Sequence, residues 1–346
     1  MTRFVGNFST QQLLPPWVSL RAKSWVFIIK VKRKCLQRYL NTHFNAAAPD
    51  QAPFHYEALN YTYGLMRVTQ HPDFSSCHNN RPGTQTLSKI DIDWAYPCYR
   101  WRVSPENIRY DRKIVWVEPL SFDNNSYTMF SSREIWGTET NMAHIEVDES
   151  LTRGKLHIDM AIEGLKKFTP KSHSHLLGCL HIRVDTETQS TLMEQIEKDR
   201  DLAAFAGVLF ASVGLQGQSL VTHDSELNTL KQFRDVFNMK VAVYRAIVQS
   251  RSDHENVSDI KIYDGSNVKL DFMWSQTMAE SLHRLFGLRK KHAKTAERGH
   301  PGGTRSIDGH EVDWDLPCLN KDVVLAASFT SDIRYDVTGT LHTYGN

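Results

Sequence analysis

Short runs of β-branched and aromatic residues, separated by polar residues, dominate the hydrophobic pattern of this chain. Such runs predict strands, because these side chains pack well on a pleated surface and Gly, Asn, Asp, Ser and Pro favour the turns between them. The predicted strands span residues 25–31, 55–63, 113–118, 156–162, 177–184, 237–248, 257–263, 268–273, 323–329 and 333–342. Asp264 and Gly265 separate two of these runs, which predicts a hairpin turn.

Three stretches show a helical pattern instead, namely residues 32–40, 191–205 and 275–286. The second opens with a capping-box pattern, in which Thr191 precedes Glu194 by three residues. Because long strands outnumber helices, the pattern favours a closed or nearly closed antiparallel sheet. We therefore expect an α+β fold that is mostly β, with a few peripheral helices.

Composition and charge narrow the function classes. The 346 residues are 40% hydrophobic and 23% charged, which is ordinary for a soluble globular protein, and the net charge of +2 does not imply a nucleic-acid partner. The five cysteines show no ligand or disulfide spacing, so no metal site is expected. The longest early apolar run, residues 25–29, is too short to span a membrane, and no signal-peptide pattern precedes it. A cytoplasmic location is expected.

The segment 131–143 carries the most informative chemistry. It places Arg133 and Glu134 in an otherwise apolar, strand-like run and then adds Gly137 and several short polar residues. A charged pair is costly to bury unless its charges pair with each other or meet a ligand. This segment is therefore our first candidate for a functional site.

The segment resembles the signature of the acetoacetate decarboxylase-like superfamily, in which Gly-Arg-Glu precedes a glycine and then Pro-Lys-Lys. The resemblance aligns Pro-Lys-Lys with Glu139, Thr140 and Asn141. The first lysine of that pattern forms the Schiff base, so the usual nucleophile is absent here. A weaker likeness covers most of residues 25–344. It implies a single domain over 1–346, with insertions near 70–102, 187–230 and 289–313.

The resemblance implies a closed antiparallel β-barrel whose interior pocket holds a small compound with a carboxylate or carbonyl group. It implies no cofactor and a homo-oligomer. The candidate catalytic residues are Arg133, Glu134, Glu139, Thr140, Asn141 and Glu57. The candidate substrate-binding residues are Arg21, for a substrate carboxylate, Gln70, Trp136 and Lys240.

These substitutions change the expected chemistry. Threonine cannot form an imine, and asparagine supplies no neighbouring charge to keep an amine neutral. The remaining acids and hydrogen-bond donors suit acid/base chemistry on a keto acid or polyketide-like substrate. The expected reactions are cyclisation, dehydration, isomerisation or lysine-independent decarboxylation, by a lyase or a cyclase/isomerase-type enzyme. The long insertions and the missing lysine point to specialised metabolism as its setting.

Two alternatives stay open. Lys240 lies on a predicted strand and is a candidate for a relocated Schiff-base lysine, which would keep decarboxylation. Alternatively, the barrel binds a small ligand without converting it.

Overall fold

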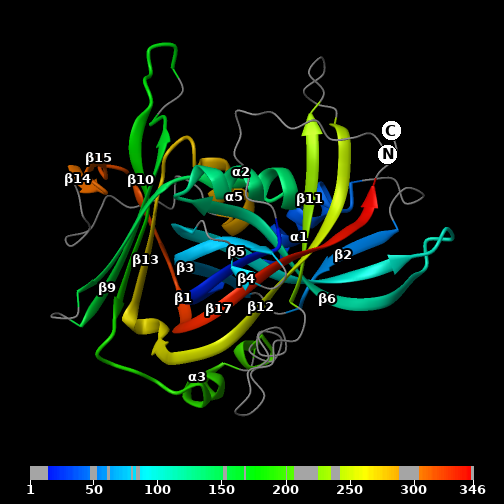
Figure 1. Cartoon of the computed structure of the whole chain (residues 1–346), viewed down its shortest axis with the longest axis horizontal. Coiled ribbons are helices and arrows are strands. Elements are labelled where there is room, and N and C mark those ends of the chain that lie inside the picture. Colours follow the sequence, from blue (N-terminus) through cyan, green and yellow to red (C-terminus); the bar gives the residue numbers. More distant parts are fainter. Residues whose placement is uncertain are drawn as a thin grey trace.

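Two β-sheets packed against each other make up most of the structure (Figure 1). The structure is a computed structural model. It describes residues 15–46, 53–60, 63–78, 81–82, 86–150, 154–166, 169–199, 201–205, 225–234, 242–287 and 304–343. In Figure 1 the strands of the larger sheet cross the centre of the view, and those of the smaller sheet run steeply beside them on the left.

The larger sheet has ten strands. They are β1 (Trp17–Lys30), β2 (Phe54–Ala58), β3 (Tyr63–His78), β4 (Arg81–Pro82), β5 (Leu87–Val103), β6 (Arg109–Asp123), β7 (Thr140–Met142), β11 (Ser225–Arg234), β12 (Ala242–Asp264) and β17 (Val323–Thr343). Their order is β2-β5-β3-β1-β17-β12-β11-β6-β7, with β4 paired to β3. Because β6 also pairs with β5, the strands from β5 to β6 close into a ring.

One junction of the ring differs from the others. β6 and β11 run parallel and share only two residue pairs, Leu227 with Trp116 and Asn228 with Val117. The other neighbours in the ring are antiparallel. Asn228 is fully buried at this junction, where its Oδ1 accepts from the Tyr56 hydroxyl at 2.9 Å and from Arg100 Nη1 at 3.0 Å. The Asn228 side chain therefore ties β2, β5 and β11 together.

The smaller sheet has seven strands. They are β8 (His144–Ser150), β9 (Lys155–Gly164), β10 (His175–Asp185), β13 (Val268–Met273), β14 (Thr304–Ile307), β15 (His310–Asp313) and β16 (Cys318–Lys321). One path runs β14-β15-β10-β13-β16, and β9 joins β10 to β8.

Short helices lie around the sheets. They are α1 (Arg33–His43), α2 (Ser126–Ser131), the π-helical turn η1 (Ser132–Trp136), α3 (Leu192–Lys198), the 3-10 turn η2 (Gly265–Asn267) and α5 (Ala279–Phe286). The Thr191 side chain caps α3 in the predicted capping box with Glu194. α5 ends at Gly287, which has φ +67°, a conformation that glycine adopts without strain.

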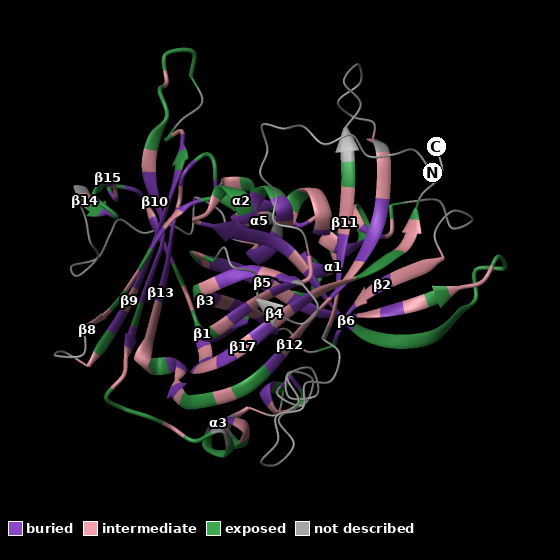
Figure 2. Cartoon of the chain, in the orientation of Figure 1, coloured by how far each residue is buried: buried purple, intermediate pink, exposed green. Residues whose placement is uncertain are grey.

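The ring strands are buried on both faces, and the two faces differ. In β5 the side chains of Ile92 and Trp94 belong to the apolar core shared with the smaller sheet. The ring centroid of Trp94 lies 6.2 Å from that of Phe272 on β13. The alternate residues Asp91 and Asp93 face the other side, the interior of the ring. Figure 2 shows the buried positions concentrated where the two sheets meet.

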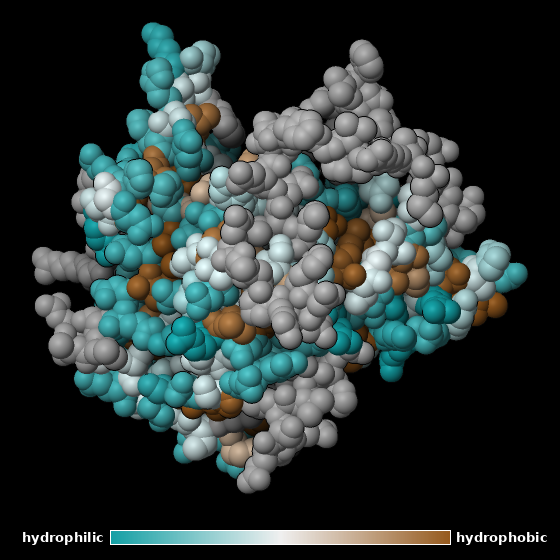
Figure 3. Space-filling model, in the orientation of Figure 1, coloured by the Kyte–Doolittle hydropathy of each residue, from teal (hydrophilic) through white to brown (hydrophobic). Residues whose placement is uncertain are grey.

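The outer surface of the molecule is mostly hydrophilic in the view of Figure 3. Apolar atoms appear at the projecting end of the β5–β6 hairpin, where Ile108 and Ile114 are exposed.

Within the part of the chain that the structure describes, no helix is long and apolar enough to cross a membrane.

The expected fold class is confirmed: the chain is mostly β, with a closed ring of strands and few helices. Two local predictions are wrong. Asp264 and Gly265 do not close a hairpin, because β12 pairs with β11 and β17 whereas β13 pairs with β10 and β16. Residues 131–136, expected to lie in a strand-like run, instead form the end of α2 and the turn η1, and Asn125 caps α2 by accepting from the backbone of Tyr127 and Thr128.

The Asn228 junction gives a test of ring closure. Asn228→Ala leaves the Tyr56 hydroxyl and Arg100 without this acceptor in a buried place, so we expect the free energy of unfolding to fall by about 1–3 kcal/mol. Urea denaturation measures this. Asn41→Ala, which removes an exposed amide from α1, is the control and should change stability by less than about 0.5 kcal/mol. Equal effects of both variants would contradict the role of Asn228.

Candidate functional site

The ring encloses a cavity with a charged middle and an aromatic end. Its volume is about 60 Å³, enough for a few waters or a very small ligand, since one water needs roughly 10–15 Å³ on this measure. The charged side chains that line it are Arg67, Lys89, Asp91, Asp93, Glu118, Asp123 and Arg251. Arg251 lies at the rim, where its side chain is 40% exposed and pairs with Asp253. The others come from β3, β5 and β6.

Lys89 provides the central cation. Its Nζ donates to Asp91 Oδ2 at 2.6 Å and to Asp123 Oδ2 at 3.3 Å, and it lies 4.6 Å from the centroid of the Phe74 ring. Burial alone lowers the pKa of Lys89, but Asp123 and Asp91 outweigh burial and raise that pKa above its ordinary value. Lys89 is therefore an ammonium at neutral pH and does not attack carbonyls as a neutral amine.

A hydrogen-bonded chain leads from Asp91 away from the cavity. His71 Nε2 lies 3.0 Å from Asp91 Oδ2, and His71 Nδ1 lies 2.8 Å from Ser19 Oγ. Burial lowers the pKa of His71 to about 4, so the imidazole is neutral, and we assign its proton to Nε2, which donates to Asp91. Burial raises the pKa of Asp91, but Lys89 and His71 outweigh burial and hold that pKa below its ordinary value. Ser19 and His71 are fully buried, so this Ser–His–Asp chain orients Asp91 and offers no nucleophile to a substrate.

Three carboxyls of the cavity, those of Asp93, Glu118 and Asp123, have a pKa that burial raises above its ordinary value. Asp93 accepts from Ser121 Oγ at 2.7 Å and from Arg67 Nη2 at 2.9 Å. Burial and the charge of Asp91 raise the pKa of Asp93 in spite of Arg67. Burial and the charge of Asp93 raise the pKa of Glu118 well above its ordinary value. A carboxyl with a raised pKa holds its proton to a higher pH than a free carboxyl does, which makes Asp93 and Glu118 candidates for proton exchange.

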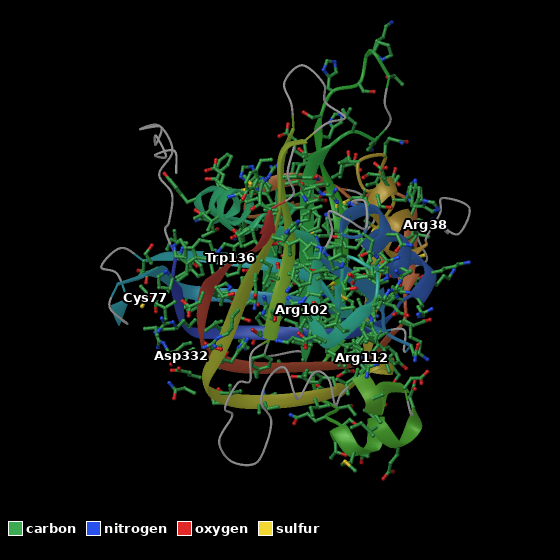
Figure 4. The ribbon with its side chains drawn as sticks, turned by 90° about the vertical axis from the view of Figure 1, so that its right-hand side faces the viewer. Arg38, Cys77, Arg102, Arg112, Trp136 and Asp332 are labelled. Carbon is green, nitrogen blue, oxygen red and sulfur yellow. The ribbon has the colours of Figure 1, made fainter. Side chains whose placement is uncertain are left out.

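Aromatic residues close one end of the cavity. Trp17 and Trp136 stack with ring centroids 5.0 Å apart and planes 7° from parallel, and Phe74 and Tyr335 complete the cluster. Figure 4 shows Trp136 beside β17, the strand of Tyr335, whose ring lies 5.7 Å from that of Trp136. Thr140 lines the cavity next to this cluster, and its hydroxyl lies 2.7 Å from that of Thr138.

Several polar atoms of the lining are buried without a hydrogen-bond partner among the described residues. They are Asp91 Oδ1, Trp136 Nε1, Ser250 Oγ and Tyr335 Oη. Buried polar groups are nearly always hydrogen-bonded, so a group of orphaned atoms around one cavity indicates a polar ligand or water there. This is the strongest sign in the structure that the cavity binds something.

Two of the sequence-predicted site residues, Trp136 and Thr140, line the cavity. The other predicted residues of the signature segment do not: Glu134 is half-buried, and Arg133, Glu139 and Asn141 are exposed. For Arg133 and Glu134 the turn of η1 is the reason, since a helical turn aims successive residues in different directions. Asn141 follows the buried Thr140 on β7, where successive side chains point to opposite sides.

The predicted residues outside that segment lie elsewhere. Glu57 forms ion pairs with Arg33 at 3.5 Å and Arg109 at 3.7 Å, outside the cavity lining. Arg21 is exposed, and its Nη2 lies 3.4 Å from Asp73 Oδ2. Gln70 is half-buried and does not line the cavity. Lys240 lies outside the described residues.

The charged residues of β5 are site residues that were not predicted from the sequence. A signal was present, because Lys89, Asp91 and Asp93 alternate with Ile90, Ile92 and Trp94 over one strand-length segment. Such alternation is typical of a strand with one polar and one apolar face.

Within the described ranges, no group of three or more His, Cys, Asp or Glu has a geometry that suits a metal ion.

Solved structures share this fold. The acetoacetate decarboxylase of Legionella pneumophila matches with a TM-score of 0.53 and 11% identity, over 99% of this chain and 92% of that one. An acetoacetate decarboxylase-like enzyme from Sphingomonas wittichii matches with a TM-score of 0.53 and 8% identity, over 95% and 94% of the two chains. The enduracididine biosynthesis enzyme MppR, complexed with the condensation product of pyruvate and imidazole 4-carboxaldehyde, matches with a TM-score of 0.50 and 10% identity, over 94% and 88%. No protein-family model and no curated protein sequence matches the chain.

The raised pKa of Glu118 predicts a pH dependence of stability. Because the pKa of Glu118 in the folded protein lies well above its ordinary value of 4.5, the folded state keeps a proton that the unfolded chain releases. Stability contributed by this group is therefore lost as pH rises above that value. Glu118→Gln removes the titration, so we expect the variant to gain stability relative to the parent as pH rises above about 4.5, the ordinary pKa of this carboxyl.

Urea denaturation at several pH values measures the difference. The matched control is Glu255→Gln, which changes an exposed carboxyl on β12 and should leave the pH dependence unchanged. A difference between Glu118→Gln and the parent that is constant with pH would contradict the raised pKa.

Proposed function

Because the chain has the acetoacetate decarboxylase-like fold, we propose that it is an enzyme that transfers protons on a small keto acid or carbonyl compound inside the ring. The observation that carries this proposal is the group of orphaned polar atoms facing a cavity in which two proton-holding carboxyls stand beside cations. A purely structural ion-pair network has no need of unsatisfied groups around an open space. MppR, which has the same fold, binds a product made from pyruvate, and this supports a keto acid as the substrate class.

The charged and polar residues that line the cavity have different roles in the proposed reaction. Asp93 and Glu118 exchange protons with the carbon next to the substrate carbonyl, because a carboxyl whose pKa is raised by burial can hold a proton and return it. Negative charge that develops on the carbonyl oxygen is stabilised by the Lys89 ammonium and the Arg67 guanidinium. The Thr140 hydroxyl adds a hydrogen-bond donor.

The protonation state of Lys89 decides which of the expected reactions we favour. It is the one lysine that lines the cavity in the described part of the chain, and its raised pKa keeps it protonated. An ammonium stabilises an enolate but forms no imine. We therefore favour enolisation followed by cyclisation, dehydration, isomerisation or lysine-independent decarboxylation over Schiff-base chemistry at Lys89. A Schiff base at Lys240, a binding role without catalysis and assembly into a homo-oligomer stay predictions.

The cavity volume sets the substrate size. A space of about 60 Å³ is smaller than the roughly 150 Å³ that accepts benzene. The proposal therefore favours a substrate of a few carbon atoms, with Trp17 and Trp136 packed against its far end.

Proton exchange in deuterated water tests the proposal whatever the final product is. Pyruvate, 2-oxobutyrate and acetoacetate are incubated with the protein, and loss of the proton signal beside the carbonyl is followed by NMR. We expect accelerated exchange with at least one compound. Asp93→Asn and Glu118→Gln should each slow it by about 10²-fold or more, the usual contribution of a positioned acid or base.

The matched control is Glu139→Gln, which changes an exposed carboxyl near Thr140 and should leave the exchange rate unchanged. Borohydride treatment with the same compounds should leave Lys89 unmodified, as judged by peptide mass. Near-normal exchange in both Asp93→Asn and Glu118→Gln would refute the assignment of roles. An adduct on Lys89 would refute the ammonium assignment.

A further inference from the structure

We propose that a cleft between the two sheets is a second ligand site, which binds a small single-ring aromatic carboxylate. The cleft lies on the outer side of the ring, between β1, β12 and β17 of the larger sheet and β8 and β9 of the smaller one. It shares no lining residue with the cavity inside the ring. The proposal is therefore independent of the function proposed for that cavity.

The floor of the cleft is apolar and aromatic. Trp25, Leu156 and Tyr263 are each less than 5% exposed and belong to the core shared by the two sheets. The half-buried ring of Phe329 extends this surface. The floor also carries two hydroxyls, since Tyr263 Oη lies 3.4 Å from the buried Ser328 Oγ. Flat aromatic rings pack well against such a surface.

The rim of the cleft carries an excess of positive charge. Three lysines and two acids line it, namely Lys23, Lys155 and Lys261 with Glu149 and Asp259. Lys23 is already engaged, because its Nζ donates to Glu149 Oε2 at 2.5 Å and joins β1 to β8. The side chains of Lys155 and Lys261 are exposed and form no hydrogen bond or ion pair within the part of the chain that the structure describes. These two ammonium groups suit an anionic group on a ligand whose body lies on the aromatic floor.

The volume of the cleft sets the size of that ligand. It measures about 200 Å³, more than three times the cavity inside the ring. A cavity of about 150 Å³ accepts benzene. The cleft therefore has room for one aromatic ring with a carboxylate, whereas the cavity inside the ring is too small for such a molecule.

Titration with 4-fluorobenzoate, followed by ¹⁹F NMR on the full chain, tests the proposal. We expect a saturable change with a dissociation constant in the millimolar range or tighter. The double variant Lys155→Gln/Lys261→Gln should weaken binding at least tenfold, because both unpaired ammonium groups are removed. Lys113→Gln, which changes an exposed lysine on β6, is the matched control and should bind as the parent does.

The neutral isostere 4-fluorobenzamide separates recognition of the charge from packing of the ring, and should bind at least tenfold more weakly than the benzoate. Equal affinity for both compounds would overturn the anionic class of ligand. Unchanged affinity in the double variant, with circular dichroism matching the parent, would overturn the location. An absence of saturable binding up to tens of millimolar would overturn the site itself.

Discussion

Charge buried inside the ring must be neutralised by other charge, and this constraint determines the site. Lys89 lies within hydrogen-bonding distance of Asp91 and Asp123, and Arg67 lies within hydrogen-bonding distance of Asp93, so both buried cations have acidic partners. Removing one partner of such a pair leaves an uncompensated buried charge, which costs about 3–5 kcal/mol. The same mutual dependence fixes the side chains in place before any substrate arrives, as catalysis by preorganised charges requires.

The constraint explains why the ring needs the second sheet. β5 carries charged residues on its inner face and Ile92 and Trp94 on its outer face, so the side chains on both faces have to be buried. The smaller sheet covers the apolar face, for example through Phe272. A shift of one residue in the register between β5 and β3 or β6 would exchange the two faces, so the buried charges and the apolar core together specify the strand pairing.

The sequence predicted the closed, mostly β architecture and most of the strands, because β-branched runs and turn residues are local signals. It did not predict the composition of the cavity. Lys89, Asp91 and Asp93 lie in a segment expected to be an insertion, and their partner Asp123 lies more than 30 residues further along the chain. Only the pairing of β5 with β6 brings these residues together, which no local pattern reveals. The resemblance directed attention to Arg133 and Glu139, whereas the structure leaves both side chains exposed, Arg133 in the helical turn of η1 and Glu139 in the segment just before β7.

The parallel junction between β6 and β11 has a dynamic consequence. Two backbone residue pairs and the hydrogen bonds of the Asn228 side chain hold it, whereas long antiparallel ladders hold its neighbours in the ring. Local openings of a protein occur where the fewest contacts have to break. We therefore expect the wall of the cavity to open first between Trp116 and Leu227, and Leu227 itself lines the cavity. Such an opening would expose the interior of the ring to a small molecule without disturbing the core between the two sheets.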